Sequence, residues 1–245
     1  TYFTAGVVNR NANIRNGAEK LSDKVVYPGE QFSCNENLVP WTEDNGWYPA
    51  GTYSDGEVVD SLGGGICQVS STLYNALLDA ELKIVERYPH SMAVSYVPLS
   101  ADAALAGDHK DLVFENDTDA PVYVQAHYSE GAITFNIYGH DTRDAGHKVE
   151  YVSKTIKTIP ITTTTKKDST KEVGYTETIA GHVGYVAELY KVTYENGKQV
   201  SKELMHTSSY KMSPTIKVVG TKKKKKEEEE TTTKKEDKTK KQDET

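Results

Sequence analysis

The chain has 245 residues, enough for one large or two small domains, and only 36% are hydrophobic, which indicates that part of the length is not core. The formal net charge is −7, and because residues 222–245 carry about +2, the rest carries about −9. Such an acidic body argues against a nucleic acid as the main partner, since phosphate binding needs a clustered basic face.

The sequence also limits how the chain can relate to a membrane. No apolar run approaches the ~18 to 20 residues that a membrane-spanning helix needs, and no signal peptide opens the chain. Two alternatives follow: a soluble cytosolic protein, or a piece of a longer secreted chain that has lost an upstream anchor. Abundant Thr and Tyr with few Phe and Met favour the second alternative.

The first sixty residues predict short strands, turns and one short helix. Residues 12–21 are compatible with an amphipathic helix that Gly17 weakens. Residues 25–26 and 31–32 suggest short strands. Aromatic side chains then gather, at Trp41, Trp47, Tyr48 and Tyr53. They indicate either buried packing of a loop-rich region or a surface on which sugars or peptides stack.

The clearest local structure follows three consecutive glycines at residues 63–65. Glycine lets the backbone enter a helical turn without a Cβ in the way. Beyond it, a helix is predicted over residues 66–82, because apolar side chains recur at helical spacing, at Ile66, Val69, Leu73, Leu77 and Leu78. This arrangement places Cys67 at or near the helix N-terminus.

The remaining elements predict two domains and a tail. Period-two alternation predicts strands at residues 82–86, 91–97, 112–114, 121–127 and 132–138. One main helix against this antiparallel sheet makes residues 1–145 an α+β domain. Residues 150–221 are rich in Thr and Ile, with a hairpin turn at Asn196–Gly197, and predict a small, elongated all-β domain. Residues 222–245 cannot bury apolar surface and predict a disordered tail.

Two resemblances to known families rest on ordered motifs. The first domain resembles the VanW family in YPGEQFS (27–33), GGGICQVSSTLYNA (63–76), ERYPHSMAVSYVP (86–98), ADAA (101–104) and DLVFEN (111–116). The second resembles a G-five domain over residues 161–222, in EVGYTETIAGHVGY, ENGK and SPTIKVVGTK. The resemblance implies an extracellular protein of the bacterial cell envelope or cell wall. Its implied partner is peptidoglycan or another glycan that contains N-acetylglucosamine, and it implies no reaction.

The residues themselves suggest thiol chemistry at Cys67. A thiol at a helix N-terminus has a lowered pKa. His90 follows as a general base, and Asp111, with Asp102 as its substitute, orients the imidazole. The glycine-loop N–H groups and Gln68 would supply an oxyanion site. By analogy, this order of elements is that of papain-like and transglutaminase-like folds, and it predicts hydrolysis or transfer of an amide in a peptidoglycan stem peptide.

Alternatives to catalysis stay open. Cys67 can equally be a small packed hydrophobe or one half of a disulfide with Cys34. No spacing supports a metal site, although His90, His109 and Asp111 could converge, and no glycine-rich segment has a phosphate or dinucleotide context, so no cofactor is expected. The main prediction is an envelope protein that acts at or binds peptidoglycan, with the β domain holding glycan. The alternative is a thiol amidase or transpeptidase that uses Cys67 and His90.

Overall fold

The computed structural model describes residues 1–54 and 57–223, and the side chains of residues 53–58 and 108 are not described. The chain forms two compact units. The first unit combines Thr1–Thr163 with Ala180–Thr215, and the second begins with Thr164–Ile179 and resumes at Ile216. The tail predicted over residues 222–245 lies outside the described residues from 224 onward, and Lys222 still belongs to a strand.

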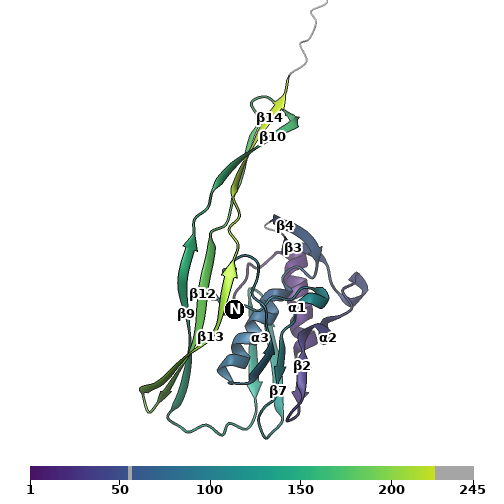
Figure 1. Ribbon diagram of the computed structural model, residues 1–245. Coiled ribbons are helices and arrows are strands. Elements are labelled where there is room, and N and C mark those ends of the chain that lie inside the picture. Colours follow the sequence, from purple (N-terminus) through teal and green to yellow (C-terminus); the bar gives the residue numbers. More distant parts are fainter. Residues whose placement is uncertain (55–56, 224–245) are drawn as a thin grey trace, which may run out of the picture. The chain divides into compact units, whose positions relative to one another are not determined.

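Two helices of equal length lie at the centre of the first unit (Figure 1). They are α1 (Val8–Leu21) and α3 (Ile66–Asp79), with 14 residues each. The helix predicted at residues 12–21 therefore begins earlier, and the one predicted at 66–82 ends sooner. Gly17 allows the two helices to approach, because a Cβ there would lie 2.3 Å from Ile66 Cδ1. Beyond α3 the chain turns at Glu81, whose φ is 56°.

Two three-stranded antiparallel sheets complete the α+β fold that the sequence predicts. One has the order β1 (Lys24–Val26), β7 (Val122–Ser129), β8 (Ala132–Tyr138), and the other β2 (Gln31–Ser33), β6 (Val113–Glu115), β5 (Lys83–Glu86). The core between helices and sheets is fully buried and apolar, with Ile14, Leu73, Phe114, Val124 and Ile133 at 0% exposure. Burial of these side chains is the main favourable contribution to folding.

Shorter elements connect the helices and sheets of the first unit. They are α2 (Cys34–Leu38), the 3-10 helices η1 (Glu43–Asn45) and η2 (Gly107–His109), and the hairpin of β3 (Pro49–Ser54) with β4 (Glu57–Leu62). The hairpin leads directly into the glycine loop before α3. The prediction of a strand at residues 91–97 is wrong, because the chain between β5 and η2 has neither helix nor strand. Its backbone groups bond to side chains instead of to a neighbouring strand.

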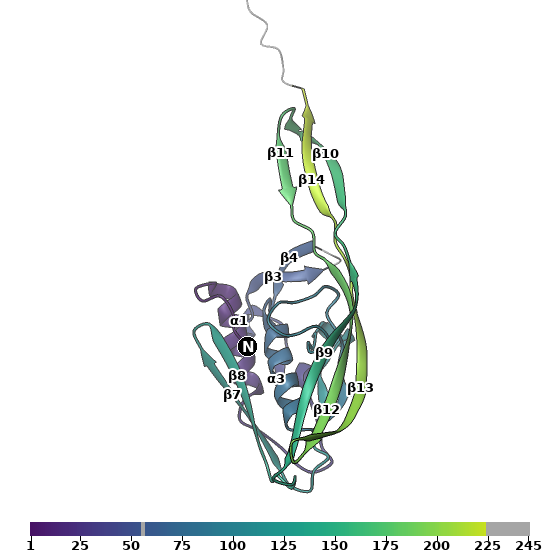
Figure 2. The same cartoon turned by 90° about the vertical axis from the view of Figure 1, so that its left-hand side faces the viewer.

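The predicted β domain contributes a sheet to each unit (Figure 2). In the first unit the order is β13 (Lys198–Tyr210), β12 (Gly184–Glu195), β9 (His147–Ile159), with Leu189 in the core cluster. The predicted turn at Asn196–Gly197 joins β12 to β13, and both residues have positive φ, at 52° and 79°. The second unit has the order β10 (Thr163–Glu172), β14 (Thr215–Lys222), β11 (Thr176–Ile179).

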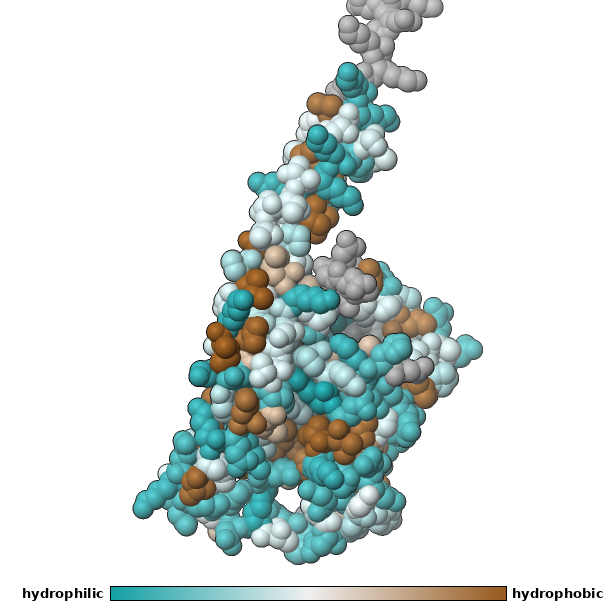
Figure 3. Space-filling model, viewed as in Figure 1, coloured by the Kyte–Doolittle hydropathy of each residue, from teal (hydrophilic) through white to brown (hydrophobic). Residues whose placement is uncertain are grey.

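The face drawn in Figure 3 is largely hydrophilic, with hydrophobic residues in small separate patches. Among the described residues, no helix is both long enough and apolar enough to cross a membrane.

Candidate active site

The glycine loop fixes the position of Cys67 in the first turn of α3. A Cβ on Gly64 would lie 2.3 Å from the carbonyl oxygen of Ala50, so only glycine fits there without movement of the backbone. Gly65 precedes the helix with a φ of 112°, a conformation that other residues rarely adopt. The Ile66 and Gln68 N–H groups donate to the Gly63 and Gly65 carbonyls, both at 3.0 Å.

The polar face of α3 binds a buried, irregular segment over residues 100–105. Ser70 Oγ donates to the Ala103 carbonyl at 2.7 Å, and the Ala103 N–H donates to Ser71 Oγ at 2.9 Å. Asn75 Nδ2 donates to the Ala101 carbonyl at 2.8 Å. Because buried backbone groups need hydrogen-bond partners, these side chains take the place of a strand ladder. They hold Asp102 and the backbone N–H of Leu105 close to α3.

Asp102 orients the imidazole of His90. Its Oδ2 lies 2.6 Å from His90 Nδ1 and accepts the His90 backbone N–H at 2.7 Å. The Asp102 side chain is only 1% exposed and that of His90 10% exposed. The Tyr96 hydroxyl lies 3.3 Å from the other ring nitrogen, His90 Nε2. The ring is therefore held by both nitrogens and by its own backbone.

The second oxygen of Asp102 is held by residues from both parts of the sequence. Arg87 pairs with Oδ1 at 2.8 Å, and the Tyr210 hydroxyl donates to the same atom at 2.6 Å. Arg87 also donates to Ser208 Oγ at 3.0 Å. The Ser100 N–H donates to the Tyr210 hydroxyl at 2.6 Å, which completes that group's bonding. Because Ser208 and Tyr210 belong to β13, the β domain supports the carboxylate that orients His90.

The protonation states of the three groups favour an ion pair. Burial would raise the pKa of Asp102, but the hydrogen bonds and charge of His90 and the charge of Arg87 hold it at about 2. Burial would lower the pKa of His90, but its hydrogen bond to Asp102 and its electrostatic interaction with Cys67 raise it to about 9. Burial would raise the pKa of Cys67, but His90 and the Leu105 N–H lower it. These shifts favour a thiolate beside an imidazolium.

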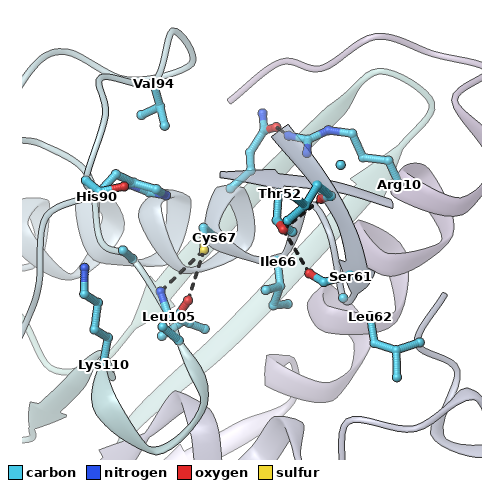
Figure 4. A pocket seen from close by; sticks show the side chains of 18 of the residues that line it. Arg10, Thr52, Ser61, Leu62, Ile66, Cys67, His90, Val94, Leu105 and Lys110 are labelled. Carbon is cyan, nitrogen blue, oxygen red and sulfur yellow. Dashed lines mark hydrogen bonds between the residues drawn. The ribbon is translucent and has the colours of Figure 1, made fainter. Parts of the chain in front are cut away.

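Cys67 and His90 line one pocket of about 610 Å³. In Figure 4 their side chains lie on the same side of this pocket, and dashed lines join the Cys67 sulfur to Leu105. The Leu105 N–H donates to Cys67 Sγ at 3.4 Å, a bond that stabilises the thiolate. The two residues predicted to act together are therefore brought together.

The structure places other predicted residues elsewhere. Asp111 does not face His90: its carboxylate accepts the Asn35 N–H at 3.0 Å and the Ser33 hydroxyl at the start of α2. Its expected position depended on the strand at residues 91–97, which does not form. Gln68 is not a free oxyanion donor, because its Nε2 donates to the Tyr2 carbonyl at 2.7 Å and to Thr1 at 3.1 Å.

The disulfide alternative is excluded, because Cys34 and Cys67 are both free thiols. Cys34 is fully buried, and burial together with the charge of Asp111 raises its pKa well above the ordinary value. It is the packed, unreactive cysteine of the two. In the described parts of the chain, no three side chains of His, Cys, Asp or Glu gather as metal ligands.

The aromatic residues divide between core and pocket. Trp47 is fully buried and donates from Nε1 to the Leu38 carbonyl at 3.1 Å, whereas Trp41 lines the pocket. Tyr48 is 42% exposed, and the side chain of Tyr53 lies outside the described part. Packing accounts for Trp47, and the stacking of a sugar or peptide on Trp41 stays a prediction.

Sequence reasoning missed Arg87 and Tyr210. Arg87 lies three residues before His90, in the block ERYPH. Its position indicates a buried ion pair only when Asp102 is already known to be buried. Tyr210 has no signal, because it lies far along the chain in a strand that alternates like many others.

Together these features define an α+β protein with Cys67 and His90 in a pocket and a buried Asp102 that orients His90 and is itself supported by an all-β region. The model of the VanW like protein family matches residues 9–138, and that of the G5 domain matches residues 150–222. The chain belongs to the VanW family.

Two relatives match a little over half of the chain. YoaR of Bacillus subtilis (strain 168) is 38% identical over 141 residues, which cover 58% of this chain and 46% of YoaR. The vancomycin B-type resistance protein VanW of Enterococcus faecalis (strain ATCC 700802 / V583) is 25% identical over 146 residues, which cover 58% and 53%. The chain spans about half the length of these curated relatives.

Solved structures of G5 domains resemble the second part of the chain. The IgA1 protease G5 domain is 26% identical, with a TM-score of 0.23, and the match covers 31% of this chain and 93% of that one. The HP0197 G5 domain is 20% identical, with a TM-score of 0.18, and the match covers 30% and 95%.

Proposed function

We propose that the chain is a bacterial cell-envelope protein that cleaves or transfers amide bonds in the peptides of peptidoglycan, with Cys67 as its nucleophile. The observation that carries this proposal is the pocket lined by Cys67 and His90, with the buried Asp102 bonded to the far side of the His90 ring. Residues 150–222 bind glycan that contains N-acetylglucosamine and keep the pocket near its substrate. The family match and the G5 match support the location and the glycan; the geometry alone supports the reaction.

The three side chains have distinct roles in an acyl transfer. The Cys67 thiolate attacks the amide carbonyl, and a bond forms between Sγ and the carbonyl carbon. The proton on His90 passes to the amine as the carbon–nitrogen bond breaks, which leaves a thioester. Water or an acceptor amine then attacks the thioester, gives its proton to His90 and releases the thiolate. Asp102 stays ionised and keeps the imidazole in place.

The negative charge that develops on the carbonyl oxygen needs hydrogen-bond donors. The first N–H groups of a helix have no acceptor within the helix. The Ile66 and Gln68 N–H groups bond to the glycine loop, so the backbone N–H of Cys67 is the proposed donor to the oxyanion. This N–H takes the role that the sequence suggested for Gln68.

Incubation with purified peptidoglycan fragments tests the reaction. The wild type is expected to release or exchange stem-peptide amides, seen by mass spectrometry, whereas Cys67→Ala and His90→Ala are inactive. Cys34→Ala is the matched control, because it removes the buried thiol and leaves the pocket intact. If the wild type changes no fragment, or if Cys67→Ala is as active as the wild type, Cys67 is not the nucleophile.

Binding to purified sacculi tests the glycan independently of the reaction. Cys67→Ala is expected to sediment with sacculi as the wild type does, and soluble oligomers of N-acetylglucosamine are expected to release it. If the oligomers do not release the protein from the sacculi, glycan that contains N-acetylglucosamine is not the ligand.

A further inference from the structure

The pocket at Cys67 carries positive charge on an acidic protein. The chain has a net charge of −7, yet the described side chains that line this pocket include no Asp or Glu. They include the cations Arg10 and Lys110, together with His90 in its protonated state. Among the described side chains, the charge at the pocket is therefore opposite to that of the chain as a whole.

Both cations have hydrogen-bond donors to spare. Lys110 Nζ donates to the Pro89 carbonyl at 3.2 Å, and a lysine ammonium has three N–H groups. Arg10 donates from one terminal nitrogen to Gln68 Oε1 at 3.1 Å, and a guanidinium has five N–H groups. Neither residue has an ion pair among the described residues. In Figure 4 they lie on opposite sides of Cys67.

Two unpaired cations around a half-enclosed pocket are unfavourable until an anion enters. Partial burial removes water from each charge, and only an opposite charge with good hydrogen bonds offsets that loss. Asp102 cannot serve, because Arg87 and His90 already pair with it. The Cys67 thiolate offsets one positive charge of Arg10, Lys110 and His90, so a positive excess remains that an anion on the ligand can offset.

We propose that the substrate carries a free carboxylate next to the bond that Cys67 attacks, and that Lys110 and Arg10 bind it. The inference rests on the proposed function and narrows its substrate to acidic peptides. A carboxylate suits both residues, because the guanidinium can bind two oxygens at once and the ammonium acts as a point charge. Neutral and cationic peptides lack the group that these side chains hold.

Two small alkylating reagents test the charge at the sulfur directly. Iodoacetate and iodoacetamide react with a thiolate in the same way but differ in charge. The measured quantity is the ratio of their rate constants for the Cys67 thiolate, taken from full pH profiles so that changes in the pKa of Cys67 do not enter. Peptide mass spectrometry confirms which cysteine has reacted.

The wild type is expected to prefer iodoacetate more strongly than the same chain unfolded in urea does. Lys110→Gln and Arg10→Gln are each expected to lower the ratio of the iodoacetate to the iodoacetamide rate constant roughly three- to tenfold. This is the effect expected from the loss of one charge in a partly desolvated site. Lys198→Gln removes an exposed charge from the β12–β13 turn and is expected to leave the ratio unchanged. His90 stays in all these variants, so its charge cannot cause the difference.

The outcomes separate this inference from the proposed function. A Cys67 that reacts readily with iodoacetamide but shows no preference for iodoacetate, or a ratio that neither Gln variant lowers, overturns the carboxylate site and leaves the thiolate intact. A Cys67 that reacts no faster than an ordinary thiol with either reagent overturns the proposed function itself.

Discussion

At the scale of single residues, the hydroxyl of Tyr210 stabilises the buried carboxylate of Asp102, which the aromatic ring alone would not do. The hydroxyl donates to Asp102 Oδ1 at 2.6 Å, and Tyr210 as a whole is only 2% exposed. Tyr210→Phe removes a hydrogen bond to a buried charge and is expected to lower the free energy of unfolding by about 1.5 to 3 kcal/mol. Urea unfolding measures this loss, and a change below about 0.5 kcal/mol, as expected for the exposed Tyr138→Phe, would contradict the role.

His90 and Cys67 give the pocket a defined pH dependence. The imidazolium lowers the pKa of the thiol, so alkylation of Cys67 by iodoacetamide is expected to reach its half-maximal rate below the pH of an ordinary thiol. In His90→Ala the pH of half-maximal alkylation is expected to rise, because burial then raises the pKa of the Cys67 thiol without a neighbouring imidazolium to lower it. An unchanged midpoint would mean that His90 does not interact with the sulfur.

The raised pKa of His90 also has a consequence for stability, with a definite sign. The folded pKa of about 9 exceeds the ordinary value of 6.5. The protonated ring therefore stabilises the fold fully below about pH 6.5, and this contribution is lost as the pH rises through about 9. The lowered pKa of Cys67 contributes with the opposite sign, so the comparison is made in a Cys67→Ala background. There the free energy of unfolding is expected to fall with pH, and to fall less when His90 is also replaced by Gln. Equal pH slopes in the two proteins would argue against the ion pair.

At the scale of secondary-structure elements, the entry into α3 depends on Gly64. A Cβ there would meet the Ala50 carbonyl, which is backbone and cannot rotate away. Gly64→Ala is expected to cost about 1 to 3 kcal/mol of stability and to slow the alkylation of Cys67. Gly139→Ala, whose Cβ would make an ordinary contact at 3.5 Å with Val122, is the control and is expected to be nearly neutral.

How far the sequence predicts the structure also depends on the kind of element. The helix at Ile66 and the strand over Ala132–Tyr138 follow from periodicity, because each has one apolar face. The segment from Ser91 to Leu105 alternates over residues 91–97, yet it forms no strand. Its backbone bonds to Ser70, Ser71 and Asn75. Side chain–backbone bonding of this kind leaves no periodic trace, so Asp102 could be named only as a substitute.

At the scale of the whole chain, the first unit needs residues beyond the first domain. Leu189 lies in its core cluster, and the Tyr151 hydroxyl donates to the Leu78 carbonyl at 2.7 Å. A fragment that ends at residue 145 is expected to unfold at a lower urea concentration than the full chain and to lose the rapid alkylation of Cys67. Circular dichroism with the alkylation assay checks both results, and a fragment with the stability and reactivity of the full chain would show that the two parts fold independently.

The support of Asp102 by β13 changes what an exchange of modules would do. A chimera that keeps residues 1–149 and takes its G5 region from another protein is usually designed to give a new binding specificity. Here it would also replace Ser208 and Tyr210, which bond to Arg87 and Asp102. The choice of graft would then change the reactivity of Cys67 as well as the proposed binding of glycan.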